Sequence, residues 1–124
     1  MLIHPDDLNS YDRFYRANLI NSLSGFKSAS LIGTKNEAEI SNLAIFSNIV
    51  HLGADPALIG FVNRPREAAP HTLKNIEATG YYTINHISNE MIDNAHQTSA
   101  KYPEGKSEFE ACGFTEEYSN NFYA

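Results

Sequence analysis

The stretch ALIGFVNRPREAAPHTLKNI (residues 57–76) contains the pattern that decides the fold. Its first seven residues form an almost continuous apolar run, which predicts a buried central strand. Proline cannot donate a hydrogen bond to a sheet, so the strand is expected to end at residues 64–66. Pro70 suits the first turn of a helix, where a missing N–H costs little, and a helix is predicted over residues 70–78. A strand, a short loop and a helix therefore follow one another directly.

Groups that bind anions meet at the junction of this strand and this helix. Arg64 and Arg66 precede the helix, and arginine can bind a phosphate through two parallel hydrogen bonds. The helix N-terminus adds unpaired N–H groups and the positive end of the helix dipole, and Thr72 adds a hydroxyl donor. This combination predicts a phosphate site. The same residues are also compatible with solvated arginines in a loop and a threonine that only caps the helix.

A second candidate segment is SNLAIFSN (residues 41–48), at the end of a predicted strand. Its side chains that could donate to a phosphate or to the polar edge of a ring are Ser41, Asn42, Ser47 and Asn48. Ala44 would permit the close approach of a ligand. The alternative is a corner between strand and loop whose polar side chains satisfy their own backbone.

The rest of the chain predicts short strands and helices around this centre. Strands are predicted at residues 28–34, 39–44 and 81–86. Short helices are predicted at residues 8–18 and from residue 88 onward. Gly80 is expected to end the helix predicted over residues 70–78. Residues 45–56 are expected to be irregular, and the tail from residue 102 is weakly patterned. Because strands and helices do not alternate regularly, a mainly-β barrel with peripheral helices is favoured over a doubly wound sheet.

Composition narrows the class of protein. The chain has 124 residues, of which 42% are hydrophobic and 19% charged, as expected for one globular domain. Its net charge of -6 argues against nucleic acid as a partner, which requires a basic face. No run approaches the roughly 18 apolar residues of a membrane span, and the N-terminus is not that of a signal peptide. A single cysteine fits a reducing compartment, so a cytoplasmic protein is expected.

Five histidines and one cysteine raise the question of a metal site or a catalytic nucleophile. Their spacing contains no C-x-x-C or H-x-x-x-H motif, so no metal ion is predicted. Cys112 is expected to be a small, partly buried side chain. His86 and His96 are interpreted as structural or peripheral residues, so no catalytic acid or base is named.

The order and spacing of several segments resemble those of the flavin reductase-like family, nearest to its flavoredoxin-type branch. These segments are NLAIFS, HLGADPALIGFVNRP, HTLKNI and TGYYTINH, together with SLSGFKSASLIGT before them and AHQTSAKYP after them. The resemblance runs from about residue 14 to the last residues. It implies a split β-barrel that binds FMN non-covalently, usually at the interface of a homodimer.

Carried over position by position, the resemblance also implies the cofactor-binding residues. Those matching the loop that lies along the flavin are Asn42, Ala44, Phe46 and Ser47. Those matching the segment near the phosphate and ribityl chain are Arg64, His71, Thr72 and Asn75. Ser28 and Thr34 would lie on a strand beside the ring. The two segments chosen on physical grounds are the ones that the resemblance selects.

Many members of this family transfer a hydride from NADH or NADPH to the flavin, and the flavin carries the difficult chemistry. The resemblance therefore implies an FMN-binding oxidoreductase that uses a nicotinamide cofactor. The alternative is a non-catalytic flavin-binding module, or a truncated fragment that keeps part of the fold without activity. Family members are normally longer, so residues 1–124 are interpreted as the N-terminal part of a single domain. The barrel is accordingly expected to be incomplete at its C-terminus.

Overall fold

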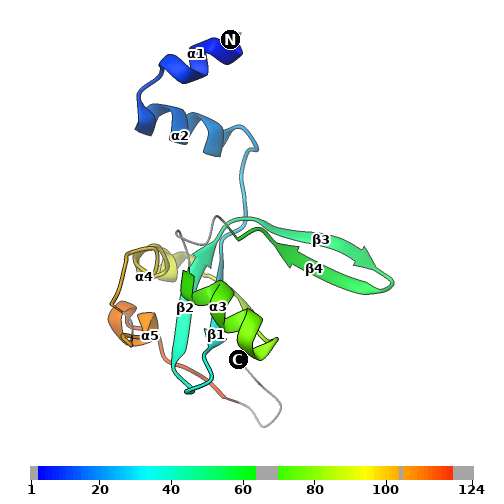
Figure 1. Cartoon of the computed structure of the whole chain (residues 1–124), viewed down its shortest axis with the longest axis vertical. Helices are drawn as coiled ribbons and strands as arrows, with labels where there is room; N and C mark the ends of the chain where they lie inside the picture. Colours follow the sequence, from blue (N-terminus) through cyan, green and yellow to red (C-terminus); the bar gives the residue numbers. More distant parts are fainter. Residues whose placement is uncertain (1–2, 64–69, 104, 119–124) are drawn as a thin grey trace.

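The computed structural model describes residues 3–63, 70–103 and 105–118, and Figure 1 shows how they are arranged. The strands are β1 (Ser30–Lys35), β2 (Ser41–Phe46), β3 (Ile49–Ala54), β4 (Ala57–Phe61) and β5 (Thr83–His86). The α-helices are α1 (Pro5–Ser10), α2 (Arg13–Ser22), α3 (Pro70–Thr79), α4 (Ile92–Gln97) and α5 (Glu108–Cys112), and a short 3-10 helix, η1 (Asn89–Met91), precedes α4.

The body of the molecule is built on an antiparallel sheet in the order β2-β1-β5. A tight turn joins β1 to β2, where the side chain of Asn36 accepts hydrogen bonds from the N–H groups of Ala38 and Ile40. Glu39 takes the left-handed conformation in this turn, with φ of 61°. The turn fixes the register, so Thr34 lies opposite Asn42.

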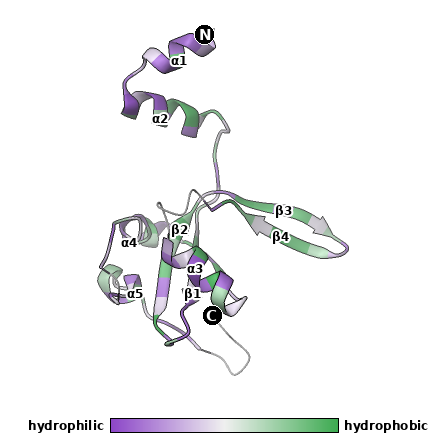
Figure 2. Cartoon of the chain, in the orientation of Figure 1, coloured by the Kyte–Doolittle hydropathy of each residue, from purple (hydrophilic) through white to green (hydrophobic). Residues whose placement is uncertain are grey.

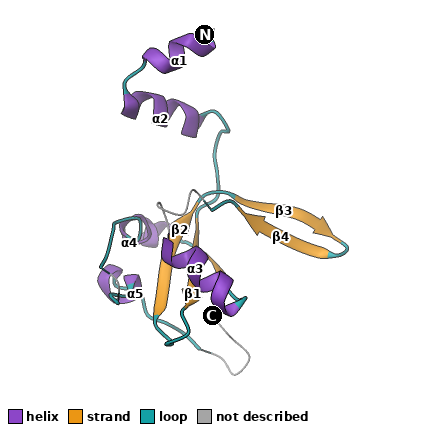
Figure 3. Ribbon diagram, viewed as in Figure 1, coloured by secondary structure: helices purple, strands orange, loops and turns teal. Residues whose placement is uncertain are grey.

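Successive side chains of a strand point to opposite faces of the sheet. Different helices cover the two faces. On one face, Leu31 and Leu43 pack with Ala95 of α4, and Phe109 of α5 packs against this cluster. On the other face, α3 packs across β1 and β2. Figure 3 shows α3 crossing in front of the sheet, with α4 and α5 beside β2.

Strands β3 and β4 form a separate hairpin that projects away from the body (Figure 1). Two predictions are wrong here. Residues 45–56 were expected to be irregular but include β3, and residues 57–63 were expected to be a buried central strand. Among the described residues β4 pairs only with β3, and Leu58 and Ile59 are 49% and 57% exposed. An apolar run predicts a strand with apolar side chains, but it does not predict which other surface the strand packs against.

The predicted fold class and two of the helix assignments also need correction. Helices hold 37% of the described residues and strands 25%, so the mainly-β description is not supported. The predicted single helix over residues 8–18 is two helices, because Asp12 caps α2 by accepting from the N–H groups of Phe14 and Tyr15. Helix α5 was missed altogether, since five residues give too short a periodic pattern to recognise.

Several predictions are confirmed. Helix α3 agrees with the predicted helix to within one residue, and Gly80 ends it with φ of 78° and an N–H bond to the Ile76 carbonyl. Strands β1, β2 and β5 match the predicted strands with shifts of one or two residues at their ends. Ser28 lies outside β1 and is exposed, so its predicted place on that strand is wrong. No helix among the described residues has the length and apolar character needed to cross a membrane.

Candidate functional site

Four buried polar side chains join α3 to the sheet, and we refer to them as the polar clamp: Thr34, Asn42, Thr72 and Asn75. Asn42 Nδ2 donates to Thr72 Oγ1 over 3.1 Å, and Asn75 Nδ2 donates to Thr34 Oγ1 over 3.1 Å. Their exposed fractions lie between 1% and 9%. Three residues that the sequence assigned to cofactor binding, Asn42, Thr72 and Asn75, are thus brought together.

Local structure explains why these four residues meet. Thr34 and Asn42 are direct partners in the β1–β2 register, so their side chains leave the sheet side by side. Thr72 and Asn75 are three positions apart on α3 and therefore share one helical face. That face is the buried one, since Thr72 and Asn75 are the buried residues of α3.

The first turn of α3 is the part of the site best suited to an anion. Pro70 is the first residue of the helix, and the half-buried His71 follows it. The N–H groups of a first turn have no partner within the helix, and the dipole adds a positive potential there. Thr72 Oγ1 accepts from Asn42, and a hydroxyl that accepts one hydrogen bond can also donate its own proton to an acceptor.

A cavity of about 50 Å³ lies beside this turn, between α3, the start of β2 and the segment before α5. Its lining includes His71 and two lysines, Lys74 and Lys106, which bring positive charge to an acidic protein. Glu108 also lines it, but this carboxylate is buried and accepts from the Leu43 N–H over 3.2 Å. The two lysines were missed by the sequence reasoning, because nothing in the local pattern brings Lys106 close to α3.

The second candidate segment follows β2 toward the β3–β4 hairpin. Asn42, Ala44 and Phe46 lie on the same face of the strand, the face on which α3 packs. Phe46 is buried and Ala44 half-buried, whereas Ser47 is exposed beyond the end of the strand. Asn42 and Ser47 are five residues apart, or roughly 16 Å along an extended strand. A ligand that touched both would have to be elongated and lie along β2.

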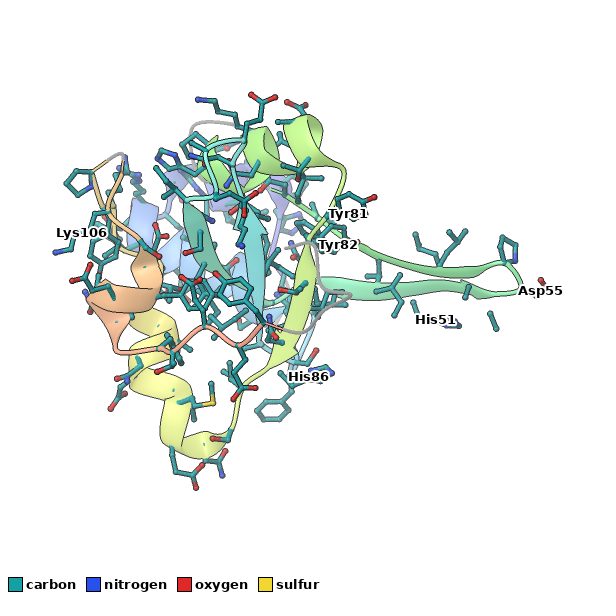
Figure 4. All side chains as sticks on the ribbon, turned by 90° about the horizontal axis from the view of Figure 1, so that it is seen from below. His51, Asp55, Tyr81, Tyr82, His86 and Lys106 are labelled. Carbon is teal, nitrogen blue, oxygen red and sulfur yellow. The ribbon has the colours of Figure 1, made fainter. Side chains whose placement is uncertain are left out.

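Aromatic rings gather where the hairpin leaves the body. Phe61 packs edge-on against Phe46 at 4.9 Å and against Tyr82 at 5.2 Å between ring centroids. Figure 4 shows Tyr82 at the base of the hairpin, with His51 and Asp55 further out along it and Lys106 on the opposite side of the body.

A buried acceptor lies next to these rings. Asn48 donates from Nδ2 to the Val62 carbonyl over 2.7 Å. Its Oδ1 is buried and has no hydrogen-bond partner among the described residues. Buried acceptors are normally satisfied, so this oxygen suits a ligand that offers an N–H donor.

Arg64 was predicted to bind the phosphate, but it lies outside the described residues, as does Arg66. The segment that contains them, residues 64–69, joins the hairpin to the first turn of α3 in the sequence. Its role therefore stays a prediction.

Another cavity among the described residues, of about 210 Å³, lies elsewhere. It is lined from the opposite face of the sheet by side chains such as Leu43 and Phe109, and by none of the eight predicted cofactor-binding residues. It is also smaller than the roughly 300 Å³ at which ligand pockets usually begin. This cavity is therefore too small to enclose a large planar ligand by itself.

The remaining sequence candidates lie away from this site. Cys112 is buried as predicted, and its Sγ lies 3.5 Å from the Tyr102 hydroxyl, a hydrogen bond that raises the pKa of Tyr102. His86 and His96 are exposed at the end of β5 and in α4. No group of three or more potential metal ligands is found within residues 3–63, 70–103 and 105–118.

Comparison with known proteins places the chain among flavin proteins. Residues 25–123 match the family described as the flavin reductase like domain. A Shewanella frigidimarina protein assigned as a flavin reductase with a split barrel domain is 48% identical, with a TM-score of 0.92 over 98% of this chain and 60% of its own. Flavoredoxin of Desulfovibrio vulgaris (Miyazaki F) is 20% identical and shares the fold, with a TM-score of 0.68 over 82% of this chain and 56% of its own.

An uncharacterised protein of Halalkalibacterium halodurans is 30% identical over 118 residues, which are 94% of this chain and 55% of that protein. The chain thus spans between 55% and 60% of the length of these three relatives. The fold is similar to that of split-barrel flavin reductases, and the membership expected from the sequence is confirmed. This chain belongs to the flavin reductase-like family.

Proposed function

We propose that this protein binds FMN and transfers a hydride from NADH or NADPH to the flavin. Family membership supports a flavin-related oxidoreductase. The observation that carries the proposal is the first turn of α3, where N–H groups with no partner within the helix, His71 and the Thr72 hydroxyl lie beside a cavity lined by Lys74 and Lys106. FMN combines a phosphate with a planar ring, and β2 leads from this turn to the aromatic base of the hairpin.

The proposed contacts follow from this arrangement. Arg64, His71 and Thr72 hold the phosphate, with Asn42 behind Thr72. Phe46 and Ser47 lie along the ring, and Ala44 leaves room for it. Asn48 Oδ1 fits the ring as well, since the flavin carries an N–H donor on its polar edge and this oxygen has no partner among the described residues. These residues bind and orient the cofactor.

The bound flavin would supply the redox chemistry, since it accepts the hydride itself. The protein then needs no side chain that donates or removes a proton at the reacting atoms. The exposed positions of His86 and His96 agree with this assignment. The protein's task is to hold the flavin and the nicotinamide together and to limit the access of water.

Replacing Arg64 or Thr72 by alanine is expected to weaken FMN binding by about tenfold each, because each change removes one charge-assisted hydrogen bond to the phosphate. Quenching of flavin fluorescence in a titration of the purified protein measures this change. Thr79→Ala is the matched control, since Thr79 lies at the other end of α3 and donates to the Asn75 carbonyl. Unchanged affinity in both Arg64→Ala and Thr72→Ala would show that the phosphate lies elsewhere.

The alternative is a flavin-binding module without catalysis. Oxidation of NADH or NADPH, followed by absorbance with FMN present, separates the two. A protein that binds FMN but oxidises neither nucleotide is the module, and one that does both is the reductase. A protein that binds no FMN contradicts both readings.

We also propose that the protein acts as a cytoplasmic homodimer, with the β3–β4 hairpin and the N-terminal arm (α1 and α2) as its contact surface. Both project from the body and carry apolar surface (Figures 1 and 2). Their exposed large apolar residues include Phe14, Ile20, Leu23, Val50, Leu52, Leu58 and Ile59. Exposed apolar surface of this extent marks an interaction site, and a second copy would also complete the cover over a flavin that one chain leaves open.

The double variant Leu52→Lys/Ile59→Lys is expected to convert the dimer to a monomer, because both side chains are more than half exposed and charges would be buried in the contact. Sedimentation velocity at tens of micromolar protein measures the change. Glu37→Lys, in the exposed turn between β1 and β2, is the control for added positive charge. A wild-type protein that sediments as a monomer would contradict the proposed dimer.

A further inference from the structure

The polar clamp holds α3 to the sheet by directional bonds. Thr34 and Asn42 lie opposite each other on neighbouring strands, and Thr72 and Asn75 lie one turn apart on the helix. The two hydrogen bonds between these pairs therefore join the same two surfaces at two points. Apolar side chains in these places would tolerate small sliding movements of the helix, but hydrogen bonds weaken steeply with distance and angle.

Burial makes the clamp selective for one position of α3. Thr34 is 1% exposed and Asn75 is 5% exposed, so neither can exchange its partner for bulk water. A shift of α3 by one residue would break both bonds and leave buried amide groups unpaired, which is costly. The clamp thus fixes both the rotation of α3 and the place of its first turn.

We infer that Thr34 and Asn75 are positioning residues for the phosphate of the flavin, which they hold in register through α3 without touching it. The inference rests on the proposed function. Thr34 lies beneath the helix, and Asn75 lies on the buried face of α3 beyond its first turn, where its amide group donates to Thr34. Contact with the phosphate is left to the first turn itself, which includes His71 and Thr72.

The ratio of FMN affinity to riboflavin affinity tests this role, because riboflavin lacks only the phosphate. Thr34→Val keeps the shape of the side chain but removes the acceptor of Asn75. It is expected to weaken FMN binding about three- to tenfold while riboflavin binding stays within about twofold. Thr34→Ser, which keeps the hydroxyl, is expected to restore the ratio. Thr98→Val is the matched control, since Thr98 is also buried, at 5% exposed, and its hydroxyl donates to the Ala95 carbonyl at the end of α4.

A double-mutant cycle shows whether Thr34 acts through Asn75. If it does, Thr34→Val, Asn75→Leu and the double variant lose similar amounts of FMN affinity, because one shared bond is removed in each. Additive losses would overturn the inference. So would an equal loss of FMN and riboflavin, which would indicate general damage to the fold, or no loss of either.

Hydrogen exchange of the α3 amides gives a readout that needs no flavin. Thr34→Val is expected to raise exchange in the first two turns of α3, and Thr98→Val is not. Unchanged exchange would overturn the clamp whatever the protein binds. Conversely, a wild-type protein that binds neither FMN nor riboflavin contradicts the proposed function, even where the exchange result agrees with the clamp.

Discussion

Ile32→Ala is expected to lower the free energy of unfolding by about 2–5 kcal/mol, the cost of a large-to-small change in a well-packed core. Ile32 is fully buried in the central strand β1. It shares the face of β1 with Thr34, so the lost side chain leaves a cavity beneath α3. The buried apolar residues of the described chain are few, so each of them carries a large share of the stability. Chemical denaturation monitored by circular dichroism measures the change.

Ile40→Ala is the control for this prediction. It makes the same substitution at a residue that is 43% exposed in the turn before β2. The expected loss there is below about 1 kcal/mol, because little apolar surface is uncovered and no cavity forms. Equal losses in the two variants would mean that Ile32 is not a core residue.

Gly33→Ala is expected to cost about 1–3 kcal/mol, as overpacking in a core commonly does. A methyl group built at Gly33 would lie 2.6 Å from Thr83 Oγ1 of the neighbouring strand β5, well inside contact distance. Thr83 has a short side chain, so it cannot move aside as a lysine could. The strain falls between β1 and β5, which are paired at these two residues. Thermal and chemical unfolding both report it.

Thr83→Ala should restore most of the stability lost in Gly33→Ala, since it removes the atom that the new methyl group meets. Thr83→Ala alone measures the cost of the second change, and the double variant completes the cycle. If Thr83→Ala failed to relieve Gly33→Ala, this contact would not be the cause of the lost stability.

The sequence alone predicted the elements whose signals are local. Pro70 and Gly80 bracket α3, and the structure places its ends within one residue of the prediction. The short strands β1, β2 and β5 were also predicted, with shifts of one or two residues at their ends. Helix-end anion binding drew attention to Thr72 without any knowledge of the fold. These features depend on neighbours in the chain, so a single sequence can reveal them.

Other features depend on which surface an element finds. The run at residues 57–63 predicts a strand but not its partner, and the structure pairs it with β3 in an exposed hairpin. Helix α5 is too short to predict, yet its Glu108 satisfies the outer N–H of Leu43 on the edge strand β2. Such pairings join residues far apart in the chain, so no local pattern contains them.

For the candidate site, too, the sequence determined some features and the tertiary structure determined others. The residue types of Asn42, Thr72 and Asn75 could be read from the sequence as possible phosphate donors. Only the tertiary structure shows that they bond to one another and to Thr34, because the β1–β2 turn and the packing of α3 decide which of them meet. Sequence determined which polar groups this region contains. The tertiary structure decided which of them are committed to the clamp, since a buried amide must satisfy its hydrogen bonds with whatever lies next to it.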